Sequence, residues 1–152
     1  MAEPVRLSLE AVWQERDHSF AGQTFSDHAG MTRTIRYTVR SVFGYGIHIT
    51  GEAIDHITAD HPEVDLREAA WVLNNPNIVL PDADFAAGTL YYRQMRNRYL
   101  VVVVHLINDI RNVVTAHLAS YLKGLASGRL TGADVLYIEG GFKWRQKLRI
   151  KT

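Results

Sequence analysis

Hydrophobic residues recur every three or four positions near the start of the chain and then change their period. The first spacing predicts a helix over residues 5–16, followed by a polar loop. β-Branched and aromatic residues alternate with polar ones over residues 33–43, and a shorter alternation covers residues 46–50. Two strands are therefore expected in this part of the chain.

Two further helices are predicted from their end signals as well as from their spacing. Thr50 is a suitable N-cap for a helix over residues 51–61, and Pro62 prevents its continuation. A second helix is predicted over residues 65–73, where leucine and alanine form one apolar stripe. The sequence Asn-Asn-Pro at residues 74–76 ends it.

The period then becomes two, which is the period of strands. Three such segments cover residues 89–95, 99–106 and 112–119. Short polar pairs at residues 97–98 and 108–109 occupy hairpin positions, so the three strands are expected to form an antiparallel meander. The middle strand is apolar on both faces over most of its length, as expected at the centre of a sheet.

Helices followed by strands predict an α+β domain, with the N-terminal helices packed on one face of an antiparallel sheet. A C-terminal hairpin is predicted from residues 135–139 and 142–151, around Gly140 and Gly141. The chain is expected to be a single domain over residues 1–152. Its expected parts are an N-terminal extension (1–45), a core (46–120) and a C-terminal extension with a basic strand (121–152).

Alternation along the strands predicts what each face of the sheet carries. In the middle strand, Leu100, Val102 and Val104 share the face expected to lie under the helices. The opposite face is expected to be free of helices and to collect the polar side chains of three strands. These are Arg93, His105, Thr115 and His117.

A cation, two imidazoles and a hydroxyl suit the cleavage of RNA. The 2′-hydroxyl is the nucleophile, so an enzyme needs a base for it, an acid for the departing 5′-oxygen and a cation for the phosphate. Histidine performs the first two roles near neutral pH, and arginine binds phosphate oxygens. No metal or other cofactor is predicted.

Simpler interpretations of the histidines stay open. A histidine beside valine in a strand is usually packed or hydrogen-bonded. His56 and His61 lie five residues apart, about 140° around a helix axis, and are expected to point in different directions. His61, at the helix end, also fits a capping role. A metal site formed by His48, His56 and His61 is a further alternative, although this spacing matches no known helical metal-binding pair.

The order of these elements resembles a known group of nucleases. The residues that carry the resemblance run from Ile47-His-Ile-Thr-Gly-Glu-Ala-Ile-Asp-His through Leu66-Arg-Glu-Ala-Ala-Trp-Val-Leu-Asn-Asn-Pro. The later Leu-Val-Val-Val-Val and Val-Val-Thr-Ala-His strands extend it, so that it covers residues 46–120. The pattern resembles phage and mobile-element nucleases of the barnase, EndoU, colicin and RelE-like (BECR) superfamily.

This resemblance implies roles for individual residues. It implies that His61, and less directly His56, are the helix-borne histidines of the active site. It further implies that Arg93 is the phosphate-binding cation and Thr115 the strand hydroxyl. His117 stands where the family more often has an aromatic residue. The superfamily also includes members without catalysis, so the resemblance bears more on fold than on activity.

Composition changes this picture in two ways. The chain has no cysteine, so any catalysis depends on histidine, arginine and hydroxyl groups, and a cytoplasmic location is expected. No signal segment or membrane span is predicted, so the protein is expected to be soluble. The net charge of +1 conceals a separation, because residues 129–152 hold six Lys or Arg against two Asp or Glu. A polyanionic partner therefore stays possible.

The C-terminal end carries a cation at every odd position from residue 143 to 151. In a strand these side chains would share one face, and Trp144 would lie beneath them or stack on a base. The predicted nucleic-acid-binding residues are Lys143, Trp144, Arg145, Lys147, Arg149 and Lys151. An equally supported interpretation is an edge strand whose lysines prevent aggregation.

The leading functional hypothesis is a metal-independent endoribonuclease of toxin type, encoded by a phage or plasmid, with RNA as its substrate. Alternatives are a non-catalytic nucleic-acid-binding protein and a protein-interaction domain on the same fold. A toxin implies a neutralising antitoxin or immunity protein, and the basic strand around Lys147 and Arg149 is a conceivable dock for an acidic one.

Overall fold

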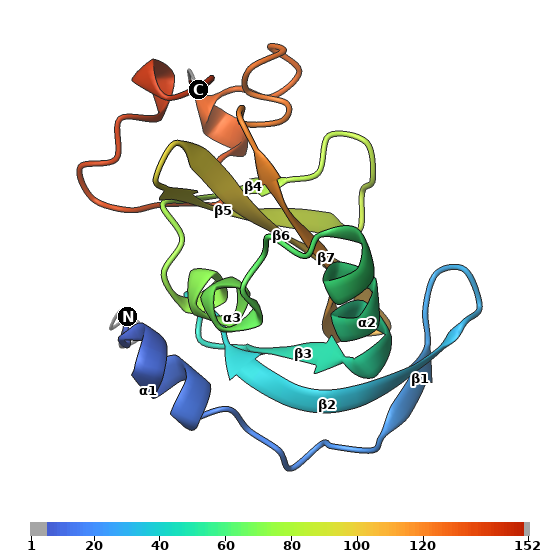
Figure 1. Cartoon of the computed structure of the whole chain (residues 1–152). Coiled ribbons are helices and arrows are strands. Elements are labelled where there is room, and N and C mark those ends of the chain that lie inside the picture. Colours follow the sequence, from blue (N-terminus) through green and yellow to red (C-terminus); the bar gives the residue numbers. More distant parts are fainter. Residues whose placement is uncertain (1–5, 151–152) are drawn as a thin grey trace.

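The computed structural model describes residues 6–150 and has an α+β fold. Three helices and one eight-stranded, mostly antiparallel open sheet make up the molecule, with strand order β1-β2-β3-β7-β6-β5-β4-β8 (Figure 1). The helices are α1 (Leu9–Gln14), α2 (Gly51–Asp60) and α3 (Leu66–Asn74). The strands are β1 (Thr24–Ser26), β2 (Thr32–Arg40), β3 (Gly46–Thr50), β4 (Ile78–Pro81), β5 (Gly88–Met95), β6 (Arg98–Ile107), β7 (Ile110–Ala119) and β8 (Tyr137–Ile138).

The two central helices begin and end within one residue of the predicted positions. The hydroxyl of Thr50 accepts a hydrogen bond from the Ala53 N–H at the start of α2, and His61 is the C-cap residue before Pro62. Asp65 caps α3 by accepting from the Arg67 N–H. Capping of this kind satisfies N–H groups that the first helical turn leaves free.

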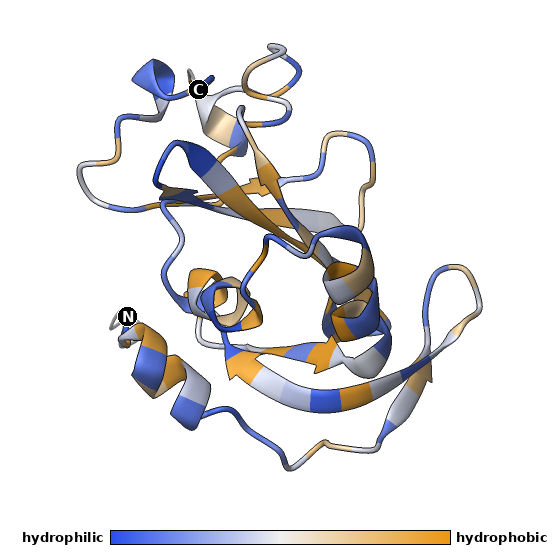
Figure 2. Cartoon of the chain, viewed as in Figure 1, coloured by the Kyte–Doolittle hydropathy of each residue, from blue (hydrophilic) through white to orange (hydrophobic). Residues whose placement is uncertain are grey.

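One face of the sheet packs against the helices and forms the first core. Leu73 and Val72 of α3 are fully buried there against Val102 and Leu100 of β6, which confirms the predicted helix-facing side of the middle strand. Figure 2 shows hydrophobic residues concentrated on the sheet strands and on the inner sides of the helices.

The opposite face of the sheet is largely covered, which corrects the expectation of an open surface. Leu122 and Leu125 are buried in one cluster with Tyr92 and Val101 on this face. Further residues of the C-terminal region pack against the same second core, including Phe142, Trp144, Leu148 and Ile150. The chain after β7 lies beyond β4–β6, away from α3 (Figure 1). Chemistry on this face is therefore restricted to what the covering leaves accessible.

The predicted C-terminal hairpin with a basic strand is wrong. Residues 137–138 pair with β4, while Trp144–Gln146 form a short 3-10 helix and Arg149 makes one isolated bridge to Tyr121. Apolar and basic residues of this segment still lie on opposite sides. The apolar residues pack directly on the second core, while Lys143, Arg145 and Arg149 are exposed. Lys151 lies outside the described residues. Two short strands, β1 and β4, were not predicted.

The β5–β6–β7 meander is confirmed, with one turn shifted. Asn108 and Asp109 both have positive φ, as a two-residue hairpin turn requires. The other turn lies at residues 96–97 instead of 97–98, and Arg96 has a φ of 58°.

A β-bulge in β7 decides which side chains reach which face. Val104 pairs with Val113, but the next pair is Val103 with Thr115, so Val114 is the extra residue. The bulge reverses the alternation of the following residues. As a result Thr115 and His117 point to the second-core side, although Val113 belongs to the first core.

Among the described residues, no helix has the length and apolar character that crossing a membrane requires.

Candidate active site around His117

His117 lines a cleft of about 380 Å³ on the second-core side of the sheet. It lies on β7 opposite Val101 of β6 and is half-buried. The polar residues that share the cleft come from the loop after β4, from β5 and from the segment after β7. They are Asp82, Asp84, Tyr92, Tyr121 and Lys123.

A second imidazole lies next to His117. The ring centroids of His61 and His117 are 5.8 Å apart. Within residues 6–150, β7 has no partner strand on the β3 side beyond Val113, because β3 pairs with β7 only at two positions. The C-terminal end of α2 occupies this edge, and its C-cap residue therefore contacts the strand.

His56 joins this group, which corrects the expectation that it and His61 point in different directions. Their ring centroids are 5.6 Å apart. The helical angle of about 140° does not apply, because His61 has left the helix with a φ of −134°. His56 Nδ1 lies 2.9 Å from Asp60 Oδ2, and His61 Nδ1 lies 3.9 Å from Glu63 Oε1.

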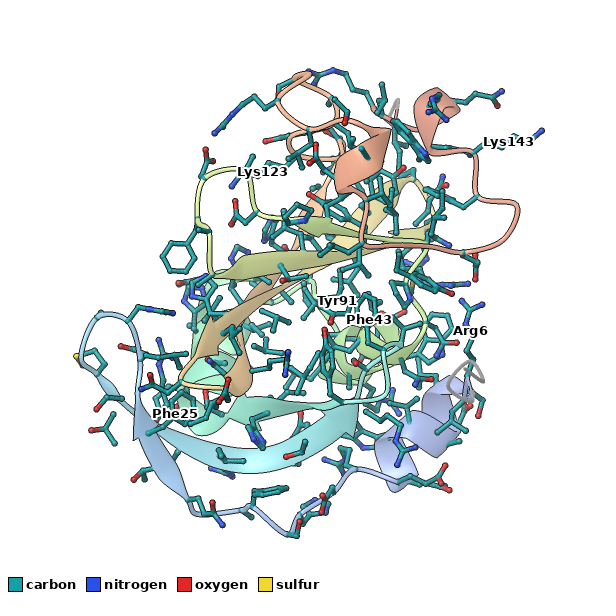
Figure 3. All side chains as sticks on the ribbon, turned by 180° about the vertical axis from the view of Figure 1, so that it is seen from behind. Arg6, Phe25, Phe43, Tyr91, Lys123 and Lys143 are labelled. Atoms are coloured by element: carbon teal, nitrogen blue, oxygen red, sulfur yellow. The ribbon has the colours of Figure 1, made fainter. Side chains whose placement is uncertain are left out.

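Lys123 is the cation of this site, and sequence reasoning missed it. Its Nζ lies 2.9 Å from both Asp82 Oδ1 and Asp84 Oδ2. Hydrogen bonds from Lys123 and Arg129 lower the pKa of Asp84 to about 2. Because Lys123 lies in a turn between the predicted meander and the predicted C-terminal hairpin, no periodic pattern marked it. Figure 3 shows it on the C-terminal side of the molecule.

The surroundings of His117 favour its neutral form. Burial, together with the positive charge that His61 can carry and that of Lys123, lowers the pKa of His117 below its ordinary value of 6.5. A ring with a lowered pKa is unprotonated at neutral pH and can accept a proton there. This is the property required of a general base.

Replacing Lys123 with glutamine should raise the pKa of His117. The substitution removes a positive charge and leaves Asp82 and Asp84 without their lysine, and both changes favour the imidazolium. An NMR titration of the His117 ring protons measures this shift. Lys143→Gln is the matched control and should leave the pKa of His117 unchanged. An unchanged or lower pKa in Lys123→Gln would show that Lys123 does not act on this ring.

Thr115 lies two residues before His117 on the same face, opposite Val103. Its Oγ1 is buried and has no hydrogen-bond partner among the described residues. Buried hydroxyls without partners are uncommon in folded proteins. Thr115 therefore has hydrogen-bonding capacity that the protein leaves unused beside the cleft.

Arg93 is not part of this group, which corrects the expectation that it shares a face with His117. It pairs with Leu100 and thus lies on the helix side. A two-residue turn pairs odd positions of one strand with even positions of the next, so Arg93 faces away from the odd-numbered residues of β6. Its Nη1 donates to the Asn75 carbonyl at 2.8 Å, and the guanidinium lies 4.5 Å above Trp71.

Arg93 also lies 3.5 Å from the Glu139 carboxylate, so it joins α3, β5 and the segment after β8. Arg93→Met should lower the free energy of unfolding by about 1–3 kcal/mol, because a half-buried carbonyl and a carboxylate lose their donor. Urea denaturation measures this loss. Arg98→Met, on the neighbouring strand and without an ion pair within residues 6–150, should have little effect. Equal stability of both variants would contradict this structural role.

His105 shares the face of His117 but belongs to another cluster. Its ring lies 4.4 Å from that of Phe85 and 5.8 Å from that of His28. Four residues of strand separate Val101, the partner of His117, from His105, a distance of about 13 Å. The two rings therefore do not act on the same group.

The structure does not support the alternative metal site. The Nδ1 of His48 lies 2.7 Å from the Thr38 hydroxyl, and the centroid of its ring is 5.1 Å from that of Phe20. Within residues 6–150 there is no group of three or more histidine or acidic side chains arranged to hold a metal ion.

Comparisons with known proteins add no relative. No protein-family model matches the chain, and neither does any curated protein or solved structure. The assignment of function therefore depends on the geometry of the site.

Proposed function

We propose that the protein is a metal-independent endoribonuclease in which His61 and His117 exchange protons with RNA. The observation that carries this proposal is the pair of imidazoles, 5.8 Å apart, beside a cleft that contains a lysine. Two imidazoles and a cation are sufficient for cleavage by 2′-hydroxyl attack. The resemblance to the BECR nucleases agrees with this activity.

The lowered pKa of His117 makes it the base in this scheme. It accepts the proton of the 2′-hydroxyl while O2′ forms a bond to phosphorus. The bond from phosphorus to O5′ breaks, and His61 donates a proton to the departing oxygen. The products are a 2′,3′-cyclic phosphate and a 5′-hydroxyl. His117 ends protonated and His61 ends unprotonated.

Lys123 replaces Arg93 as the proposed phosphate-binding cation. Its side chain is 35% exposed, so a phosphate at the cleft can approach it without unfolding of the segment after β7. Thr115, whose buried hydroxyl has no hydrogen-bond partner within residues 6–150, is the proposed donor to a phosphate oxygen, and this role requires that RNA binding exposes the hydroxyl. Charge-assisted bonds of this kind stabilise the transition state most where water is excluded.

Incubating the purified protein with a defined RNA in EDTA, across pH 5 to 8, tests the proposal. Cleavage is expected in the presence of EDTA and should be absent with DNA of the same sequence, which has no 2′-hydroxyl. A His61→Asn/His117→Asn double variant, purified in parallel, excludes a contaminating nuclease. Intact RNA throughout this range would overturn the proposal.

A second candidate function, nucleic-acid binding without cleavage, is favoured by a separate observation. Several cations near the β5–β6 turn and the C-terminal 3-10 helix have no carboxylate partner within residues 6–150. They include Arg96, Arg98, Lys143 and Lys147. Salt-dependent binding of RNA without any product would support this candidate over the first.

A further inference from the structure

A groove of about 440 Å³ lies between the end of β5 and the C-terminal 3-10 helix. Three cations line it, Arg96, Lys143 and Lys147, and no carboxylate does. Figure 3 shows Lys143 extending from this edge of the molecule. The composition of its walls indicates a negatively charged ligand.

Glu139, an acid that contacts the groove residue Asn77, is already neutralised. Glu139 accepts from Arg6 at 2.6 Å and lies 3.5 Å from Arg93, and its Oε1 accepts from the Asn77 side chain. The amide of Asn77 is also occupied at its oxygen, which accepts the Gln94 N–H at 2.6 Å. The positive charge of the groove is therefore not balanced from within residues 6–150.

Two carboxamides in the groove are free. The side chains of Gln94 and Gln146 line it and make no hydrogen bond within the described part of the chain. A carboxamide both donates and accepts, as the edges of bases and the 2′-hydroxyl do. The backbone of an acidic peptide also donates and accepts, so the carboxamides alone do not distinguish the two ligands. The closeness of the groove to the cleft at His117 favours RNA over an acidic protein.

The backbone at Arg96 supports this interpretation. Its φ of 58° lies in the left-handed region, where glycine and asparagine are favoured and a long side chain is uncommon. The two-residue hairpin turn requires a positive φ at this position, and glycine or asparagine would meet the requirement at lower cost than arginine. The conformation places a cation at the rim of the groove.

An RNA strand bound at His117 can also reach the groove. Gln94 pairs with Tyr99, which pairs with Ala119, two residues beyond His117 on the same face. Gln94 and His117 are therefore two strand spacings apart across the sheet and two residues apart along it, which together give a distance of about 12 Å. The Tyr99 hydroxyl donates to the Lys147 carbonyl at 2.6 Å and so fixes the C-terminal wall of the groove to β6.

We propose that this groove binds the phosphodiester backbone and base edges of single-stranded RNA, next to the cleavage site. The proposal rests on the proposed function for the identity of the ligand, but not on catalysis. The cations hold phosphates, Gln94 and Gln146 contact polar groups of the nucleotide, and Phe142 provides an apolar wall. The sequence pattern pointed to Lys143 and Lys147 but not to Arg96 or the two glutamines.

Fluorescence anisotropy with a labelled, fully 2′-O-methylated RNA of about 12 nucleotides tests the site without cleavage. An Arg96→Gln/Lys143→Gln/Lys147→Gln variant should bind at least about 10-fold more weakly and lower the salt slope by about 2. The matched control, Arg36→Gln/Arg40→Gln/Arg67→Gln, makes the same charge change at exposed positions elsewhere. It should bind nearly as the wild type does.

Gln94→Ala/Gln146→Ala should weaken binding without changing the salt slope, because no charge is removed. The 2′-O-methylated probe cannot be cleaved, so a failure of catalysis stays separate from a failure of this site. Equal weakening in both triple variants would overturn the proposal. So would no binding by the wild type at low salt, or equally effective displacement of the RNA by polyglutamate of matched charge, which would identify an acidic protein as the ligand.

Discussion

Replacing His117 with asparagine is expected to slow RNA cleavage by about 10²- to 10⁴-fold, the contribution typical of a general base. Asparagine retains a polar side chain but cannot accept the proton of the 2′-hydroxyl near neutral pH. Initial rates on a labelled oligonucleotide measure the effect. His105→Asn is the matched control, because His105 is on the same sheet face but in a separate cluster with His28.

The two histidines of α2 and its C-cap make this test more specific. His61→Asn should produce a loss comparable to that of His117→Asn, whereas His56→Asn should retain most activity, because His56 contacts Asp60 and not His117. Equal activity of the His117 variant and the wild type would remove His117 from the mechanism. A large loss of cleavage rate in His105→Asn alone would show that the active site is the cluster of His105, His28 and Phe85.

Leu122→Ala is expected to lower the free energy of unfolding by about 2–5 kcal/mol. Leu122 is fully buried in the second core, so truncation leaves a cavity where the segment after β7 joins the sheet. Urea denaturation measures the loss. Leu136→Ala is the control, because Leu136 is 51% exposed and should change stability by less than about 0.5 kcal/mol.

This comparison decides whether the C-terminal region is part of the folded domain or only an extension of it. A small effect of Leu122→Ala, equal to that of Leu136→Ala, would contradict the second core. Because Lys123 follows Leu122, the same result would also mean that the lysine of the cleft is not firmly positioned.

Local signals were sufficient for the helices and the meander. The caps at Thr50 and Asp65 act within one helical turn, and Asn108 and Asp109 accept positive φ at low cost, so neighbouring residues determine these features. The prediction of the C-terminal hairpin was wrong for the opposite reason. Its apolar residues pack against strands distant in sequence, which alternation alone does not reveal.

The candidate site was predicted only in part, because its faces depend on alternation across three strands. Arg93 was assigned to the wrong face, since a two-residue turn opposes odd and even positions. Thr115 and His117 were placed with His105 correctly, but only because the bulge at Val114 reverses the alternation. Without it they would face the first core.

The contact between His61 and His117 had no sequence signal. It depends on β3 leaving β7 after two pairs, which opens an edge for the end of α2. The Lys123 ion pairs likewise join residues about 40 positions apart. The acidic residues Asp82 and Asp84 after β4 indicated that a cation could pair here, but nothing in the sequence identified it as Lys123.

The chemical nature of the cleavage products tests the central claim most directly. A synthetic RNA with one labelled end, incubated with the protein in EDTA and analysed by mass spectrometry, should yield fragments ending in 2′,3′-cyclic phosphate paired with fragments beginning in 5′-hydroxyl. A single 2′-deoxy substitution at the cleaved nucleotide should prevent cleavage there. Fragments with 3′-hydroxyl and 5′-phosphate ends, or RNA that stays intact, would contradict catalysis by His61 and His117.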